Sequence, residues 1–105
     1  VAKARPAPSA IKLNNEAWAL VDPDRADKAT DVGRGLKLAR AAVQVDAKYL
    51  PVRDTYAWAL FANGLYEEAL TASAEALEMA STREKSAYSS YLNRMRGMVK
   101  AAGGR

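Results

Sequence analysis

The stretch Asp54–Ala80, DTYAWALFANGLYEEALTASAEALEMA, decides the fold of this chain. On either side of Asn63-Gly64 its apolar residues recur every three to four positions, which predicts two helices that each bury one face. Asn and Gly both tolerate the left-handed backbone that ends a helix, so this pair is the predicted break. The stretch therefore predicts an antiparallel helical hairpin.

The composition of the whole chain favours one all-α domain. Half of the 105 residues are hydrophobic, and alanine is frequent among them, which suits closely packed helices better than a sheet. The chain has no Cys and no His, which removes thiolate nucleophiles, imidazole bases and nearly every zinc site. The remaining acids Asp54, Glu67 and Glu68 stand at predicted helix starts, where negative charge is favourable anyway. We expect no catalytic residue, no cofactor and no metal site.

The same periodicity and capping signals divide the rest of the chain into helices. Ser9 is the predicted cap of the first helix and Asp31 that of the second, while Pro51 fits the first turn of the third. Ser81 and Glu84 form a capping box that opens the last helix. The expected helices cover 10–21, 32–45, Pro51 to the Asn63-Gly64 break, 66–80 and about 82–102.

The first nine residues are rich in Ala and Pro and are predicted to be an extended linker. Because the chain begins at Val1, we expect it to be a piece of a longer protein or a matured one. No apolar run approaches the roughly 20 residues of a membrane span. The compartment stays open, cytoplasmic or periplasmic if the source is bacterial.

The segment Asp22–Asp31, DPDRADKATD, carries four aspartates. Their spacing fails the EF-hand pattern, which needs a Gly at the sixth loop position and a Glu at the twelfth. We interpret them as turn and cap residues. Gly33 and Gly35 lie inside the next predicted helix, where each costs about 1 kcal/mol of helix stability, so a close approach of another helix is the expected reason for both.

The last 21 residues, Lys85 to Arg105, include five basic residues and no acid. The preferred interpretation is the solvated face of a terminal helix, and the alternative is a site for acidic peptide or nucleic acid. No aromatic residue follows Tyr91 among the basic ones, which argues against nucleic acid as a partner.

An internal repeat runs through the chain. The segment AWAL occurs at 17–20 and at 57–60, an offset of 40 residues, whereas 41–46 aligns with 75–80 at an offset of 34. The difference of six residues falls in the Asp-rich segment. The chain is therefore predicted to hold two copies of one helical hairpin, at about 10–47 and 50–80, with an insertion in the first.

A helical hairpin repeated every 34 residues resembles the tetratricopeptide repeat. The resemblance covers about Ala10 to Ala80, and the second copy carries its small and large positions at Ala57, Leu60, Gly64, Tyr66, Ala69, Ala76 and Leu77. It implies a right-handed α-solenoid of two hairpins, closed by the fifth helix as a solvating cap.

The resemblance also implies a concave groove lined by the first helix of each hairpin. The positions that line it are Ile11, Asn14, Trp18, Val21 and Asp22 in the first copy and Pro51, Asp54, Trp58, Phe61 and Ala62 in the second. The candidate binding residues among them are Asn14, Trp18, Asp54, Trp58 and Phe61. Large amphipathic rings are common binding anchors. The alternative is that both tryptophans are core, Trp18 against the third helix and Trp58 against the last.

The function that follows from the resemblance is a non-catalytic scaffold that binds a protein or peptide segment in the groove, as one module of a larger bacterial protein. Asn14 and Trp18 stand where the chaperone-tail-binding subgroup has a Lys and an Asn, so a chaperone tail is not expected. A self-association module, forming a homodimer, is the alternative, because two repeats are fewer than the roughly three usually needed for stability. A lesser alternative is the regulatory tail of an upstream enzyme.

Overall fold

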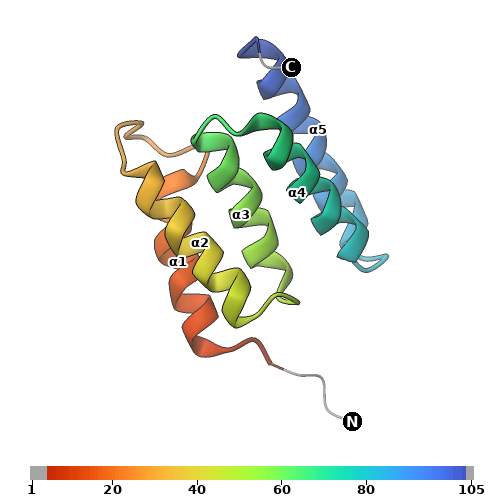
Figure 1. Cartoon of the computed structure of the whole chain (residues 1–105). Helices are drawn as coiled ribbons and strands as arrows, with labels where there is room; N and C mark the ends of the chain where they lie inside the picture. Colours follow the sequence, from red (N-terminus) through yellow and green to blue (C-terminus); the bar gives the residue numbers. More distant parts are fainter. Residues whose placement is uncertain (1–4, 104–105) are drawn as a thin grey trace.

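The structure, a computed structural model, describes residues 5–103 and is helical throughout, with no strand in that range (Figure 1). This confirms the all-α prediction. The helices of the described chain are α1 Pro8–Val21, α2 Val32–Val45, α3 Leu50–Ala62, α4 Tyr66–Met79 and α5 Lys85–Ala101. No helix among these residues is both long and apolar enough to cross a membrane.

Most predicted helix starts are confirmed by the hydrogen bonds at their ends. Asp31 Oδ1 accepts from the backbone N–H of Arg34 at 3.0 Å and so caps α2. Before α5, the backbone N–H of Ser81 donates to Glu84 Oε1 at 3.0 Å and the N–H of Glu84 donates to Ser81 Oγ at 3.3 Å. These are the two bonds of the predicted capping box, followed by one turn before the regular helix begins at Lys85.

The predicted start of α1 is wrong by two residues. Ser9 does not cap the helix but lies inside it, because Pro8 takes the first helical position, where its missing N–H costs nothing. The N–H of the preceding Ala7 donates to Asp46 Oδ2 at 3.1 Å, which ties the entry of α1 to the α2–α3 connection. The first four residues of the predicted linker lie outside the described residues.

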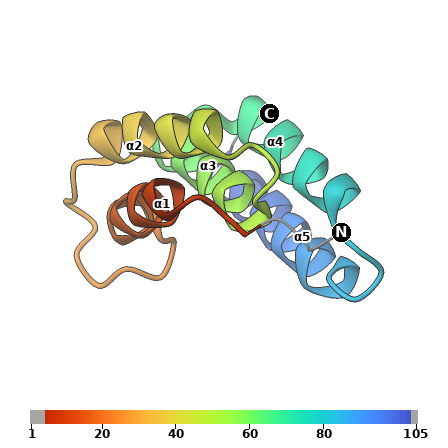
Figure 2. The ribbon, with the colours of Figure 1, turned by 90° about the horizontal axis from the view of Figure 1, so that it is seen from below.

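The helices form two layers. Consecutive helices run in opposite directions, and α1, α3 and α5 lie in one layer while α2 and α4 lie in the other (Figures 1 and 2). Each helix packs on the next, and α1 also packs directly on α3. The first helix of each hairpin and the last helix therefore share one face of the molecule.

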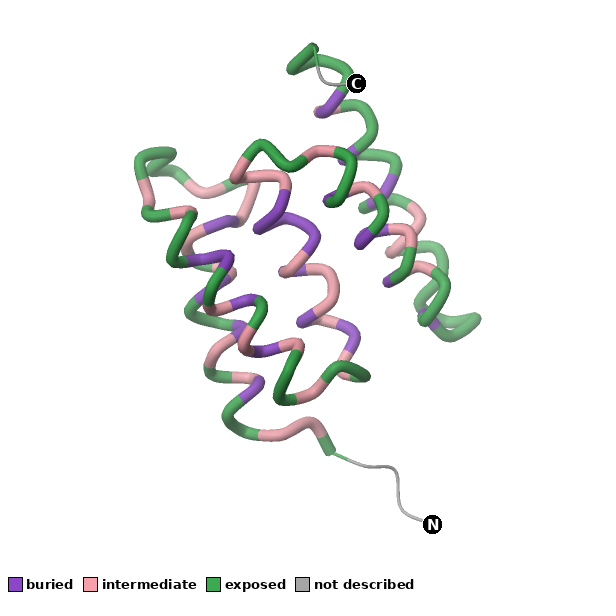
Figure 3. The backbone as a smooth tube through the Cα atoms, in the orientation of Figure 1, coloured by how far each residue is buried: buried purple, intermediate pink, exposed green. Residues whose placement is uncertain are grey.

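The core runs between the two layers (Figure 3). Its largest fully buried side chains are Val21, Val52, Leu60 and Met95, and each side chain of this kind contributes about 1.5–3 kcal/mol on burial. Alanines fill most of the other buried positions, among them Ala17, Ala39, Ala57, Ala59 and Ala69. Small side chains at the contacts let the helix backbones approach closely, which is the packing that the alanine-rich composition predicts.

The break between α3 and α4 is a Schellman turn. The N–H of Leu65 donates to the carbonyl of Leu60 at 3.0 Å, and the N–H of Gly64 donates to the carbonyl of Phe61 at 2.9 Å. Gly64 has the left-handed φ of +78° that the motif requires. Asn63 Nδ2 donates to the carbonyl of Val32 at 2.9 Å, so this turn also holds the start of α2.

Replacing Gly64 by alanine is expected to lower the free energy of unfolding by about 1 kcal/mol, because an L side chain at positive φ is strained. A Cβ at this position would meet no atom within 4 Å, so the loss would come from the backbone alone. Gly97→Ala in α5 is the matched control, since it has equally open surroundings and no positive φ, and we expect it to stabilise by about 0.5–1 kcal/mol. Urea unfolding followed by circular dichroism measures both variants. Equal effects of the two substitutions would contradict the strain at Gly64.

The two glycines of α2 differ, and the prediction of a close approach is correct for only one of them. A Cβ on Gly35 would lie 2.5 Å from Val21 Cγ1 and 3.1 Å from Leu20 Cβ, so α1 and α2 touch at this point. A Cβ on Gly33 would meet only Asp31 Oδ1, at an ordinary 3.6 Å. The close approach of α1 explains Gly35 and does not explain Gly33.

Candidate functional site

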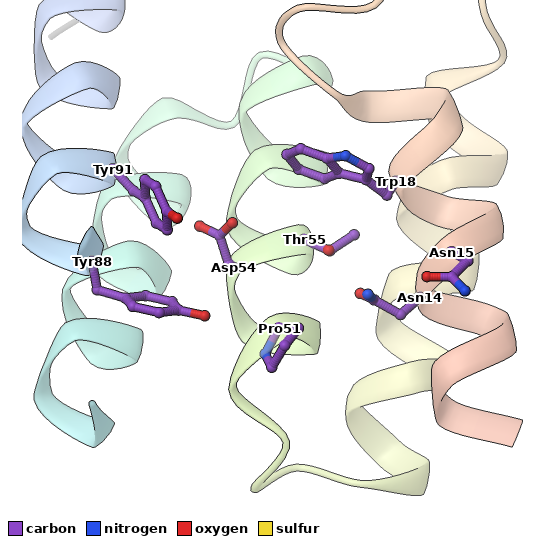
Figure 4. A pocket seen from close by; sticks show the side chains of 8 residues that line it. All are labelled: Asn14, Asn15, Trp18, Pro51, Asp54, Thr55, Tyr88 and Tyr91. Atoms are coloured by element: carbon purple, nitrogen blue, oxygen red, sulfur yellow. The ribbon is translucent and has the colours of Figure 1, made fainter. Parts of the chain in front are cut away.

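A pocket of about 250 Å³ opens between α1, α3 and α5, on the face that these three helices share (Figure 4). Each of the three helices supplies part of its wall. The lining residues are Asn14, Asn15 and Trp18 from α1, Pro51, Asp54 and Thr55 from α3, and Tyr88 and Tyr91 from α5. Three of the five predicted binding residues, Asn14, Trp18 and Asp54, are thus brought together.

Asn14 is the most deeply buried polar residue that α1 contributes to the pocket. Its side chain points from α1 toward α3 and is only 9% exposed (Figure 4). Its Oδ1 has no hydrogen-bond partner among the described residues. A buried acceptor without a donor costs about 1–3 kcal/mol, so this atom is poised to accept a hydrogen bond from a bound group.

Asp54 places a carboxyl group in the same pocket from the second turn of α3. Burial raises its pKa to about 6 from an ordinary value of 3.8, and a hydrogen bond from the Trp58 side chain opposes this shift only in part. Its Oδ1, like that of Asn14, has no hydrogen-bond partner in the described chain. At neutral pH the group is ionised and largely desolvated.

Aromatic rings form the side walls of the pocket. Trp18 stands on the α1 side, and Tyr88 and Tyr91 stand on the α5 side with their ring centroids 5.1 Å apart in an edge-to-face arrangement (Figure 4). Burial raises the pKa of Tyr88, and the negative charge of Asp54 raises it further, so its hydroxyl stays protonated at any physiological pH. Tyr91 is 39% exposed and stands at the pocket mouth.

Trp58 and Phe61, the other two predicted binding residues, do not line the pocket. Trp58 is 2% exposed in the core and contacts Phe61 edge-to-face at 5.5 Å. The guanidinium of Arg94, on α5, lies 5.7 Å from the Trp58 ring centroid. The alternative interpretation, in which Trp58 is core against the last helix, is therefore the one that the structure shows. Trp58 reaches the pocket only through its hydrogen bond to Asp54.

The tyrosines of α5 are the pocket residues that sequence reasoning missed. Tyr88 and Tyr91 were expected on the buried stripe of α5, but that stripe consists of Leu92, Met95 and Val99. The two tyrosines lie beside this stripe, where α5 faces the pocket. Treating α5 as the first helix of a third hairpin, with the same inward positions as α1 and α3, would have placed them in the groove.

The Asp-rich segment serves turns, a cap and one long-range contact. Asp22 Oδ1 accepts from the N–H of Asp24, and Asp27 Oδ1 from that of Ala29, both at 2.8 Å. Asp24 pairs with Arg94 through both guanidinium nitrogens, which joins the insertion to α5. The turn and cap interpretation is confirmed. Within residues 5–103 no three acidic side chains are arranged to hold a metal ion.

Comparisons with known proteins found no relative. A scan against models of protein families gave no match, and searches of curated proteins and of solved structures gave none either.

Proposed function

We propose that this chain is a short right-handed α-solenoid of two tetratricopeptide-like hairpins, α1–α2 and α3–α4, closed by α5 as a capping helix. The two-layer arrangement supports the proposal, because α1, α3 and α5 occupy one layer as the inner helices of such a solenoid would. The Schellman turn at Gly64 supports it as well, since Gly64 stands at the small turn position of the repeat pattern.

On this fold, the proposed function is non-catalytic binding of an extended segment of a partner protein in the groove between α1, α3 and α5. The observation that carries the proposal is the pocket itself. It is built from one helix of each hairpin and from α5, and it holds two buried acceptor atoms, Asn14 Oδ1 and Asp54 Oδ1, that lack donors within the described chain. Buried polar atoms are nearly always satisfied in stable proteins, so unsatisfied ones in an open pocket indicate a site that a ligand completes.

A pull-down of partner proteins tests the groove. We expect the double variant Trp18→Ala/Tyr91→Ala to lose most of the partner recovered by the wild type, because it removes one aromatic wall on each side of the pocket. Leu65→Ala, which truncates an exposed apolar side chain outside the pocket, is the matched control and should retain the partner.

A second variant covers the case in which the double variant is unstable. Asn15 is exposed at the pocket rim, so Asn15→Trp obstructs the pocket without removing core contacts. Circular dichroism confirms that each variant is folded. Undiminished recovery with both folded groove variants would reject the groove as the binding site.

The alternatives from the sequence remain separable by experiment. Light scattering on the purified chain distinguishes a monomeric interaction module from a homodimer, and a dimer that Leu65→Ala disrupts would favour self-association instead. The larger bacterial protein of which this module would be one part, and an upstream enzyme that it would regulate, are tested by the complete reading frame.

A further inference from the structure

The polar groups that face the pocket without partners are all acceptors. Asn14 Oδ1 and Asp54 Oδ1 are both buried, and neither receives a hydrogen bond from the described residues. A bound group that complements them must bring N–H or O–H donors. A ligand carboxylate or phosphate would place further acceptors against them and leave every one of these atoms unsatisfied.

The charge in the pocket points the same way. Asp54 is the one acid among the eight lining residues, and none of those eight is basic. Arg94, which lies against the Trp58 ring on α5, already pairs with Asp24. The carboxylate of Asp54 is therefore left without a cation at close range.

The walls of the pocket favour a cation as well. Trp18, Tyr88 and Tyr91 present aromatic rings around the carboxylate of Asp54 (Figure 4). A cation over an aromatic ring gains about 0.5–2 kcal/mol, more when it is desolvated, and rings around an acid are a recurring way to hold ammonium and guanidinium groups. A volume of about 250 Å³ is below the usual range for a whole ligand and suits one side chain.

The net charge of the chain, +4, opposes a cationic ligand only weakly. Exposed charges farther away than about 8 Å are largely screened at physiological ionic strength, whereas the Asp54 carboxylate acts at contact distance inside a partly desolvated pocket. The local charge therefore decides which side chain the pocket accepts.

We propose that the pocket between α1, α3 and α5 is a subsite for the cationic side chain of a lysine or arginine in the partner segment. Asp54 neutralises the charge, Asn14 accepts a hydrogen bond, and the rings of Trp18, Tyr88 and Tyr91 enclose the cation. The inference rests on the proposed groove function and adds the chemistry of the group that the groove selects.

Protonation of Asp54 sets the expected pH dependence of binding. The titratable groups near it are Tyr88 and Tyr91 on α5, Glu84 before α5 and Tyr49 before α3, while α1 contributes none to the pocket lining. The tyrosines stay neutral in this range. Binding should weaken as the pH falls from 7 to 5, because the Asp54 carboxylate, with a pKa of about 6, gains a proton.

NMR titration with blocked amino acids tests the subsite directly. The probes are the N-acetyl amides of arginine, lysine, glutamine and glutamate, and the readout is the ¹H–¹⁵N spectrum, including the indole N–H of Trp18 and the backbone amides around Asp54. We expect the arginine and lysine probes to shift these signals saturably, with dissociation constants in the millimolar range. Asp54→Asn should weaken this binding about tenfold or more, as the loss of a charge-assisted hydrogen bond predicts. Glu78→Gln, which removes an exposed acid on α4 away from the pocket, should leave it unchanged.

The outcomes separate this inference from the groove function on which it rests. Equal binding of the glutamine probe, stronger binding of the glutamate probe, or absence of any shift at the pocket would overturn the cationic subsite. The pull-down with Trp18→Ala/Tyr91→Ala would still show whether the groove binds a partner. If that pull-down fails while the arginine and lysine probes bind, the subsite stands and the extended-segment proposal falls.

Discussion

Replacing Gly35 by alanine is expected to lower the free energy of unfolding by about 2 kcal/mol, although alanine is the better helix former by about 1 kcal/mol. The new Cβ would lie 2.5 Å from Val21 Cγ1 and 3.1 Å from Leu20 Cβ. Val21 is 1% exposed and its β-branched side chain has little freedom to rotate away. The added atom must therefore push α1 and α2 apart.

The control for this effect stands in the same helix. A Cβ on Gly33 meets only Asp31 Oδ1, at 3.6 Å, so Gly33→Ala should be neutral or stabilising. A double-mutant cycle with Val21→Ala isolates the contact, because removing Cγ1 should make Gly35→Ala much less damaging than it is in the wild type. Urea unfolding of the four proteins gives the coupling energy. Additive effects, or equal stability of Gly33→Ala and Gly35→Ala, would show that α1 and α2 do not touch at this point.

Replacing Asp54 by asparagine is expected to stabilise the chain at neutral pH. The native carboxyl has a pKa of about 6, raised by burial from 3.8. An acid with a raised pKa binds its proton more tightly in the folded state, so its ionisation costs stability as the pH rises from about 4 to 6 and continues to do so above 6. A shift of about two pKa units corresponds to roughly 2–3 kcal/mol, an upper value because the asparagine amide must also find partners.

The pH profile of unfolding measures this effect. We expect Asp54→Asn and the wild type to have similar stability near pH 4 and to diverge up to pH 7, where the variant is the more stable. Asp24→Asn is a control of opposite sign, since the hydrogen bond from Arg94 lowers the pKa of Asp24 and its contribution is lost when the pH falls. A wild type that is as stable as Asp54→Asn at pH 7 would mean that the carboxylate is satisfied within the fold.

These two positions connect stability to the proposed site in different ways. Gly35 belongs to the packing that fixes α1, from which Asn14 and Trp18 reach the pocket. Asp54 lowers the stability of the free protein while offering a charge that a cationic side chain would neutralise. A group that costs stability and lines an open pocket is what a site under selection for binding presents.

The arrangement of pocket residues was only partly accessible from the sequence. Asn14, Trp18 and Asp54 could be placed in one groove because the repeat puts them at inward positions of two equivalent helices. Trp58 could not be assigned in the same way, since position along a helix does not say how far a side chain is covered by a helix that follows later. Tyr88 and Tyr91 were assigned to the core because α5 belongs to no repeat copy.

The sequence by itself determined the helices and their turns, because helical periodicity, proline at helix starts and the Asn63-Gly64 break act over a few neighbouring residues. Only the tertiary structure decided that Trp58 is core, that Gly35 marks a helix contact and Gly33 does not, and that Tyr88 and Tyr91 face Asp54. Those properties depend on the distance between helices far apart in the chain. Local patterns do not encode that distance, and the packing of α1, α3 and α5 sets it.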